Sequence, residues 1–376
     1  MTREVATTME LKQVNRGKVF SYIYQERETS KQAIAQELGM SMPTVTQNVN
    51  YLLENGLVEK RGQYESTGGR KAGILCCNAF SRIAIGVELL KEQTRVAALD
   101  LYGNVLAQKD FPVQFQPTED YLAQFGEWIN SFVHTLPYNP ASVLGVRIAI
   151  QGLISPDGET VSYGEIIKCT GMKRADFQKY IELPCSLVHD IDASAAAELW
   201  HHPEISDAVF FSLNRNLGGA LIVNGELHQG KHFSSGIVEH ICLEPGGLPC
   251  YCGRRGCAEV YCSANSLVLR SDMDWETFFQ HVHSGDAVCC KIWDDYLHYL
   301  ARAMDMVRMV VNCEFILGGY LQHFFTDQDI AQLQQYVEEQ CAFKGMKFSL
   351  RRDQYGEMAS ALGAAMQLLK NFLQSV

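Results

Sequence analysis

One short segment of the chain carries four side chains that bind soft metal ions. His240 is followed by Cys250, Cys252 and Cys257 within 18 residues, and two glycines between the cysteines allow the chain to reverse tightly. Three thiolates and one imidazole complete a tetrahedral zinc shell and leave no position for water or substrate. The spacing therefore predicts a closed, structural zinc site.

Two alternatives to this ligand set remain open. Cys242 and Cys262 flank the segment and are competing ligands, or the cysteines are reduced core residues beside an unrelated histidine. A loop rich in glycine and arginine is poorly suited to a core, which disfavours the second reading. The 13 cysteines cannot all pair internally, and the chain starts without an apolar signal segment. We therefore expect a reduced, cytoplasmic protein, and no apolar run approaches the ~20 residues of a membrane span.

The N-terminal residues follow the pattern of a small helical module. We expect helices over residues 9–24 and 31–38, a tight turn at Gly39, and a third helix that Ser41 caps and Asn55 and Gly56 end. A strand over residues 57–60 and a glycine-rich segment reaching residue 71 then predict a two-stranded wing. The apolar stripe expected on the first helix consists of Leu11, Val14, Val19, Phe20 and Ile23.

The outer face of the third helix carries hydroxyls and amides, where an ordinary solvated face has Glu and Lys. Such groups bond base edges in the major groove, and an arginine on a glycine-rich wing tip can enter a minor groove. The alternative is a helical cap with a charged loop. The expected DNA contacts are Ser41, Thr44, Thr46, Gln47 and Asn50 on the helix, and Arg70 and Lys71 on the wing.

The formal charge of −11 argues against a nucleic-acid partner for the whole chain. Dividing the chain after Ala72 reverses that conclusion, because the first piece carries +2 and the remainder −13. Binding to DNA would then depend on geometry and specific contacts more than on charge.

From residue 74 onward, apolar runs alternate with helical periodicity. Strands are expected over residues 83–87, 96–101, 105–107, 145–151, 208–213 and 219–223, with another ending at Asp190, and helices over 121–136 and 193–200. Strands followed by helices, occurring twice, predict an α/β chain of two similar halves. We expect a DNA-binding domain over residues 1–72 and a second domain over 73–376, with lobes of approximately 73–190 and 191–376.

The wing sequence Ser-Thr-Gly-Gly-Arg-Lys and the His-to-Cys-x-Cys-Gly-x-x-Gly-Cys-x-Glu segment resemble the ROK family of repressors, open reading frames and kinases. The likeness covers almost the whole chain and is strongest to regulators related to the N-acetylglucosamine and xylose repressors. It implies a two-lobed, actin-like (sugar-kinase/ribonuclease H-like) domain behind the winged helix-turn-helix.

The family's kinases hold ATP phosphates on glycine-rich turns, and this chain departs from both. Residues 88–94 contain no glycine where the family has Asp-x-Gly-Gly-Thr, and residues 214–220 carry bulky side chains in the second loop. Only Gly318 and Gly319 resemble the adenosine-side turn. Because phosphoryl transfer depends on positioning those phosphates, we expect neither ATP binding nor enzyme activity.

The sugar side of the family pattern is half retained. Asp192 falls at the family's catalytic Asp, where it would contact a ligand hydroxyl, cap the following helix, or do both. Two polar positions of the family are Ile191 and Ile237 here. The residues left for a ligand are Asp192, Glu239, His240 and Glu259. A deoxy, N-acetylated or phosphorylated sugar, or loss of ligand binding, fits this change.

Taken together, these features predict a zinc-containing transcriptional regulator, a repressor of carbohydrate-related genes that binds operator DNA and a sugar or sugar-derivative effector. A homodimer or dimer of dimers follows, since one module contacts only one half-site. The alternatives are a sugar kinase fused to a DNA-binding module and a thiol- or zinc-responsive regulator.

Overall fold

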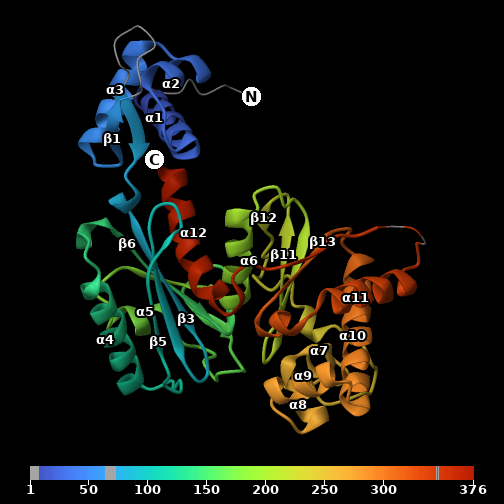
Figure 1. Ribbon diagram of the computed structural model, residues 1–376. Helices are drawn as coiled ribbons and strands as arrows, with labels where there is room; N and C mark the ends of the chain where they lie inside the picture. Colours follow the sequence, from blue (N-terminus) through green and yellow to red (C-terminus); the bar gives the residue numbers. More distant parts are fainter. Residues whose placement is uncertain (1–7, 64–72, 344, 346) are drawn as a thin grey trace.

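The computed structural model describes residues 8–63, 73–343, 345 and 347–376. Figure 1 shows a small N-terminal module above a two-lobed body, with the C-terminal helix running from the body to the module. Within the described residues no helix combines the length and apolar character needed to cross a membrane.

The N-terminal module is a winged helix-turn-helix. Its elements are α1 (Thr8–Glu26), α2 (Lys31–Glu37), α3 (Met42–Glu54), β1 (Val58–Gln63) and β2 (Gly73–Cys77). Ser30 and Ser41 cap α2 and α3 by accepting hydrogen bonds from Ala33 N and Thr44 N. Because β2 pairs antiparallel with β1, the sheet of the module continues past residue 72 to Cys77.

The apolar stripe of α1 is only partly buried. Val19, Phe20 and Ile23 are fully buried in the core of the module, whereas Leu11 and Val14 are each 53% exposed. The predicted apolar stripe is therefore buried over its last three members and exposed at its first two. The residues packed in this core lie along the second half of α1, so its first half projects beyond them.

The first lobe is built on a five-stranded sheet in the order β5-β4-β3-β6-β9. Three antiparallel strands come first, and two parallel strands follow. The elements of this lobe are β3 (Ile83–Leu89), β4 (Thr94–Leu99), β5 (Val105–Phe111), α4 (Glu119–Thr135), β6 (Val143–Ile150), β7 (Leu153–Ile154), β8 (Val161–Tyr163), α5 (Arg174–Gln178) and β9 (Cys185–His189).

The second lobe repeats this topology in the order β12-β11-β10-β13-β14, again three antiparallel strands followed by two parallel ones. Its sheet consists of β10 (Ala208–Leu213), β11 (Leu217–Val223), β12 (Glu226–Leu227), β13 (Glu314–Gly318) and β14 (Leu350–Arg352). Its helices are α7 (Glu259–Cys262), α8 (Ala264–Ser271), α9 (Trp275–Ser284), α10 (Ala287–Arg308) and α11 (Asp327–Gln340). Two halves of one topology are the actin-like arrangement expected from the sequence.

Two helices join the lobes. Helix α6 (Asp190–His201) leads from the first sheet to the second, and α12 (Ala359–Ser375) returns to pack on the first sheet. They approach closely, since a Cβ on Gly363 would lie 1.8 Å from the Ala193 carbonyl oxygen. The lobe division expected at residue 190 therefore differs for α12, which follows the second lobe in sequence but packs on the first.

The far end of α12 reaches the N-terminal module. Phe372 packs edge to face against Phe20 of α1, with ring centroids 6.4 Å apart, and Val376 lies beside Gly17. Tyr24 of α1 stacks on Tyr102, which follows β4. The module is thus docked on the first lobe through both α12 and the β4–β5 turn (Figure 1).

Candidate DNA-binding surface, metal centre and interlobe cleft

Helix α3 presents the polar face expected from the sequence, but its side chains differ in exposure and in whether they are already hydrogen-bonded. Gln47 and Asn50 are exposed, while Thr44 and Thr46 are partly buried. The Ser41 hydroxyl accepts a hydrogen bond from Thr44 N and lies 2.9 Å from the Thr44 hydroxyl. Ser41 and Thr44 therefore shape the start of the helix, and Gln47 and Asn50 are the groups most available to a groove.

Basic and aromatic groups beside this face were missed from the sequence. Lys31, at the start of α2, donates to Asn50 Oδ1 over 3.5 Å, and the Arg16 guanidinium lies 3.4 Å above the Tyr51 ring. Helical spacing within α3 alone could not identify Lys31 or Arg16, because these two basic residues come from α2 and α1. Arg70 and Lys71, predicted for the wing tip, lie outside the described residues.

The predicted metal ligands come together. One ligand atom from each of His240, Cys250, Cys252 and Cys257 lies within 4.8 Å of all the others. Cys252 Sγ and Cys257 Sγ are 3.8 Å apart, as are Cys250 Sγ and His240 Nδ1. Sulfurs bound to zinc at 2.3 Å in a tetrahedron are separated by about 3.8 Å, so the four residues fit a zinc ion.

The loop that carries these ligands is held by its own backbone. Cys250 N donates to Arg254 O, and the Arg254 side chain donates to His240 O over 2.6 Å. Of the two competing cysteines, Cys262 is fully buried in the core of the second lobe, and Cys242 Sγ lies 3.8 Å from Arg255 O. Neither belongs to the group of four.

Glu259 lies two residues after the last ligand, Cys257, and is buried. Its two carboxylate oxygens accept hydrogen bonds of 2.7 Å from Asn216 Nδ2 and Leu217 N. Burial raises the pKa of Glu259 to about 7, although these two donors oppose the shift. The carboxylate therefore ties the ligand loop to the β10–β11 turn at the cleft.

Asp192 lies in the first turn of α6 and does not cap it. The helix begins at Asp190, three residues earlier than expected, because β9 runs into it directly through His189. The capping role considered for Asp192 is therefore wrong. Its Oδ2 accepts a 2.7 Å hydrogen bond from Gln229 Nε2 of the second lobe, so the group spans the cleft.

His189 lies among the carboxylates at the start of α6. Its ring nitrogens are 3.4 Å from Asp190 Oδ1 and 3.8 Å from Asp192 Oδ1. Burial lowers the pKa of His189, but the two aspartates and Glu239 outweigh it and raise the pKa to about 9. The imidazole is therefore protonated at neutral pH and balances one carboxylate charge.

Glu239 also faces this cluster. Burial, assisted by the negative charges of Glu259 and Asp190, raises its pKa to about 8, and its Oε2 is buried without a hydrogen-bond partner in the described structure. Ile191 fills space where the family has a polar group, since a Cβ on Gly218 would meet it at 2.8 Å.

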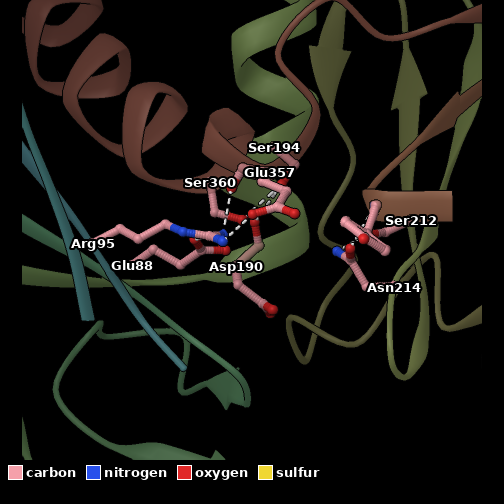
Figure 2. Close-up of polar contacts among 9 residues, drawn as sticks. Glu88, Arg95, Asp190, Ser194, Ser212, Asn214, Glu357 and Ser360 are labelled. Carbon is pink, nitrogen blue, oxygen red and sulfur yellow. Dashed lines mark hydrogen bonds and ion pairs between the residues drawn. The ribbon is translucent and has the colours of Figure 1, made fainter. Parts of the chain in front are cut away.

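Ion pairs occupy the region that corresponds to the ATP-phosphate site of the family's kinases. We call this region the nucleotide half of the cleft and the region around Asp192 the effector half. Arg95 Nη1 lies 3.2 Å from Glu88 Oε2 and donates to the Glu357 backbone oxygen over 2.9 Å, and Arg95 Nη2 pairs with the Glu357 carboxylate. Figure 2 shows these groups together with Ser194 and Ser360, whose hydroxyls are 2.8 Å apart. This network joins β3, β4, α6 and the start of α12.

Side chains of the protein also bond across the segment that corresponds to the family's second phosphate loop, residues 214–220. Asn214 Nδ2 donates to Ser212 Oγ over 3.0 Å (Figure 2). Asn214 Oδ1 accepts a hydrogen bond from Tyr320 N. Arg215 in this loop pairs with Glu92 of the first lobe at 2.7 Å. Both loops that would hold a triphosphate are therefore joined to each other or to neighbouring turns by side chains.

A winged helix-turn-helix followed by two lobes of actin-like topology defines the class of this protein. The ROK family model matches residues 84–371, so the chain belongs to the ROK family.

Among its relatives is the DNA-binding transcriptional dual regulator NagC of Escherichia coli K12, 27% identical over 262 residues. That match covers 69% of this chain and 64% of the regulator's length. The xylose repressor of Bacillus subtilis strain 168 is 21% identical over an alignment of 388 positions, gaps included, that covers 99% of each protein. A solved structure described as a ROK family transcriptional regulator, homologous to the E. coli MLC protein, has a TM-score of 0.78 at 21% identity and covers 97% of both chains.

Proposed function

We propose that this protein is a DNA-binding transcriptional regulator, a cytoplasmic repressor of carbohydrate-related genes whose operator affinity is set by a sugar or sugar derivative. It acts as a homodimer, contains one structural zinc ion and has no kinase activity. The relatives described as a transcriptional regulator and a xylose repressor support this proposal. The fold supplies a winged helix-turn-helix suited to DNA and an interlobe cleft suited to a sugar.

One observation carries the proposal: a single helix, α12, contacts both the interlobe network and the DNA-binding module. The start of α12 lies at the interlobe network, where Ser360 meets Ser194 of α6, and its end packs on α1 through Phe372 and Val376. A change in lobe closure therefore shifts the element on which the DNA-binding module rests.

The mechanism follows from this connection. An effector that binds one closure of the lobes more tightly shifts the population toward it. In a dimer, the movement of α12 alters the separation of two α3 helices, which must match two half-sites about 34 Å apart. Gln47 and Asn50 read bases, Lys31 contacts phosphate, and zinc holds the ligand loop against the cleft.

The absence of kinase activity in this proposal rests on the filled nucleotide half. Arg95, Glu357, Asn214 and Arg215 bond to protein groups where phosphates would need donors and space. Phosphoryl transfer requires those positions to be free for substrate and metal. A panel of hexoses with ATP should therefore give no phosphorylated product.

The DNA-binding part is tested with an operator selected from random DNA by the full-length protein. Gln47→Ala should lose about 1–3 kcal/mol of discrimination at one base position, whereas Lys31→Ala should weaken binding to all sequences and lower the salt dependence. The exposed Lys109→Ala, on β5, is the matched control. Failure to enrich any sequence, or unchanged selectivity in Gln47→Ala, would remove α3 from recognition.

The effector part is tested by titrating that operator complex with sugars, amino sugars and their acidic derivatives. At least one compound should change operator affinity and raise the melting temperature of the free protein. If only peroxide or a chelator changes affinity, the thiol- or zinc-responsive alternative replaces sugar control.

A further inference from the structure

Arg147 occupies an unusual position for a charged residue. It lies within β6, in register with Gly86 of β3 on one side and Ser186 of β9 on the other. Residues paired across adjacent strands share a face of the sheet, so its side chain lies on the face that α12 covers. A Cβ on Gly86 would lie 1.8 Å from the Ala361 carbonyl oxygen, which leaves the side toward the small Ser186, at the sheet edge, for the guanidinium.

The guanidinium has no ion-pair partner among the described residues. Within the described part of the chain no hydrogen bond or ion pair joins Arg147 to another residue, and its Nε is buried without an acceptor. Burial lowers the pKa of Arg147, and only the charge of Asp192 opposes that shift. Ser186 Oγ beside it, and Gln367 Oε1 on α12, are buried and unpaired as well. A buried charge without a partner is costly unless a further group completes it.

Arg147 lines a cavity of about 200 Å³ between the lobes. Its walls include Asp192 and His189 from α6 and the end of β9, the turn over residues 155–158, and Gln229 and Phe233 from the second lobe. The cavity therefore adjoins the position where a ligand hydroxyl would meet Asp192.

The other charged groups around the cavity already bond to groups of the chain itself. His189 lies between Asp190 and Asp192, and Gln229 also donates to Asp192. Asp157 is exposed and accepts hydrogen bonds from Ser155 Oγ and Glu159 N. Arg147 thus offers a planar pair of donors, the geometry that binds carboxylate or phosphate through two parallel hydrogen bonds.

We propose that Arg147 is an anion-binding residue of the effector site, and that the effector is a sugar derivative carrying a carboxylate or a phosphate. This inference rests on the proposed function only in taking the ligand to be a sugar. It also accounts for Ile191 and Ile237, since recognition through an anionic substituent needs fewer bonds to hydroxyls.

The test is calorimetric titration of the full-length, zinc-containing protein with matched ligands: a neutral hexose, its 6-phosphate and its uronate, each also as the N-acetylated form. We expect one charged member to bind at least tenfold tighter than its neutral parent. The phosphate and uronate arms identify which anion is recognised, and inorganic phosphate alone measures the contribution of the anion.

Two variants locate the effect. Arg147→Met should abolish the preference for the charged member and leave the neutral parent bound as in the wild type. Lys109→Met removes the same charge from β5, at the opposite edge of the sheet, and should change nothing. Because Arg147→Met removes a partly buried charge that has no ion-pair partner among the described residues, its ligand-free melting temperature should be equal to or above the wild-type value, which separates lost binding from lost folding.

Three outcomes overturn the inference: no member of the panel binds, neutral and charged members bind alike, or Arg147→Met retains the preference for charge. If a neutral sugar alters operator affinity while charge has no effect, the proposed function stands and the role of Arg147 fails. If the anion binds through Arg147 but no compound alters operator affinity, the proposed function fails and the anion site stands.

Discussion

The two halves of the interlobe cleft differ in where their charged groups are directed. In the nucleotide half, Arg95 and Arg215 pair with glutamates of the chain itself. In the effector half, Nε of Arg147 and one oxygen of Glu239 are buried without a hydrogen-bond partner among the described residues. The same family fold therefore holds one site closed by its own side chains and another whose polar groups are incomplete.

The difference indicates how a kinase-like fold can serve as a regulator. A filled nucleotide half joins β3, β4, α6 and the start of α12 without a cofactor, so it can fix the point about which α12 moves when the lobes close. The incomplete half remains able to respond to a ligand. In this arrangement the first half supplies a fixed hinge and the second supplies the signal.

Loss of the proposed zinc ion should have the largest effect on this comparison, because the metal would hold the loop that carries His240 and Glu259. Cys257→Ser should lose zinc and lower the free energy of unfolding by about 5 kcal/mol or more, since structural zinc contributes ~10–16 kcal/mol of binding free energy in zinc-finger peptides. Elemental analysis and chemical unfolding measure the two effects.

Cys242→Ser is the matched control for this prediction. Cys242 flanks the same loop but lies outside the group of four, so its substitution should leave one zinc per chain. Retention of full zinc in Cys257→Ser, or loss of zinc in Cys242→Ser, would contradict the assignment of ligands.

Removing the Arg95 ion pairs of the nucleotide half should have the next largest effect on the free energy of unfolding. Arg95→Met leaves Glu88 buried without its cation, which should cost about 3 kcal/mol of stability. Adding Glu88→Gln should recover part of that loss, since the second change removes the uncompensated carboxylate. Chemical unfolding of the single and double variants measures both, and Arg352→Met, whose partner Asp327 is exposed, is the control. An Arg95→Met protein as stable as wild type would show that the Arg95 ion pairs do not stabilise this half of the cleft.

The sequence could predict the parts of this comparison that are local. Ser41 and the glycines at 39 and 56 mark the ends of helices through short-range preferences, and four ligands within 18 residues can meet only by closing one loop. The loss of glycine from residues 88–94 is visible in the same way.

Long-range pairing could not be predicted. Arg95 and Glu357 are 262 residues apart, and nothing in the spacing of either indicates the other. The start of α6 was misplaced because a strand that runs directly into a helix has no turn residue to mark the boundary. Arg147 looks like any charged residue within a strand until its register with Gly86 and Ser186 is known.

The pH dependence of stability tests the buried carboxylate of the nucleotide half. Burial, with the charge of Asp190 added and that of Arg95 opposing, raises the pKa of Glu88 to about 7. The folded state therefore binds this proton more tightly than the unfolded state, so the stabilisation is complete below pH 4.5 and is lost as pH rises through 7. Relative to wild type, Glu88→Gln should gain about 2 kcal/mol between pH 5 and 8.

Urea unfolding of both proteins across that range measures the difference, in which the other titrating groups cancel. Glu338→Gln changes an exposed carboxylate and should track the wild type at every pH. A constant difference between Glu88→Gln and wild type would mean that Arg95 keeps Glu88 ionised throughout.

The smallest effect should come from the outer pair of the nucleotide half, Glu92 and Arg215, whose side chains are 55% and 56% exposed. Exposed pairs contribute about 0.2–1 kcal/mol, and salt screens them. Because Arg215 also lies over the Trp275 ring, at 5.3 Å, its single substitution removes two contacts, and only a double-mutant cycle with Glu92→Ala isolates the pair. The coupling energy should fall toward zero at about 1 M salt, where the Debye length is ~3 Å. A coupling energy above about 2 kcal/mol that persists in salt would show that the Glu92–Arg215 pair contributes more than Arg95 to holding this half of the cleft closed.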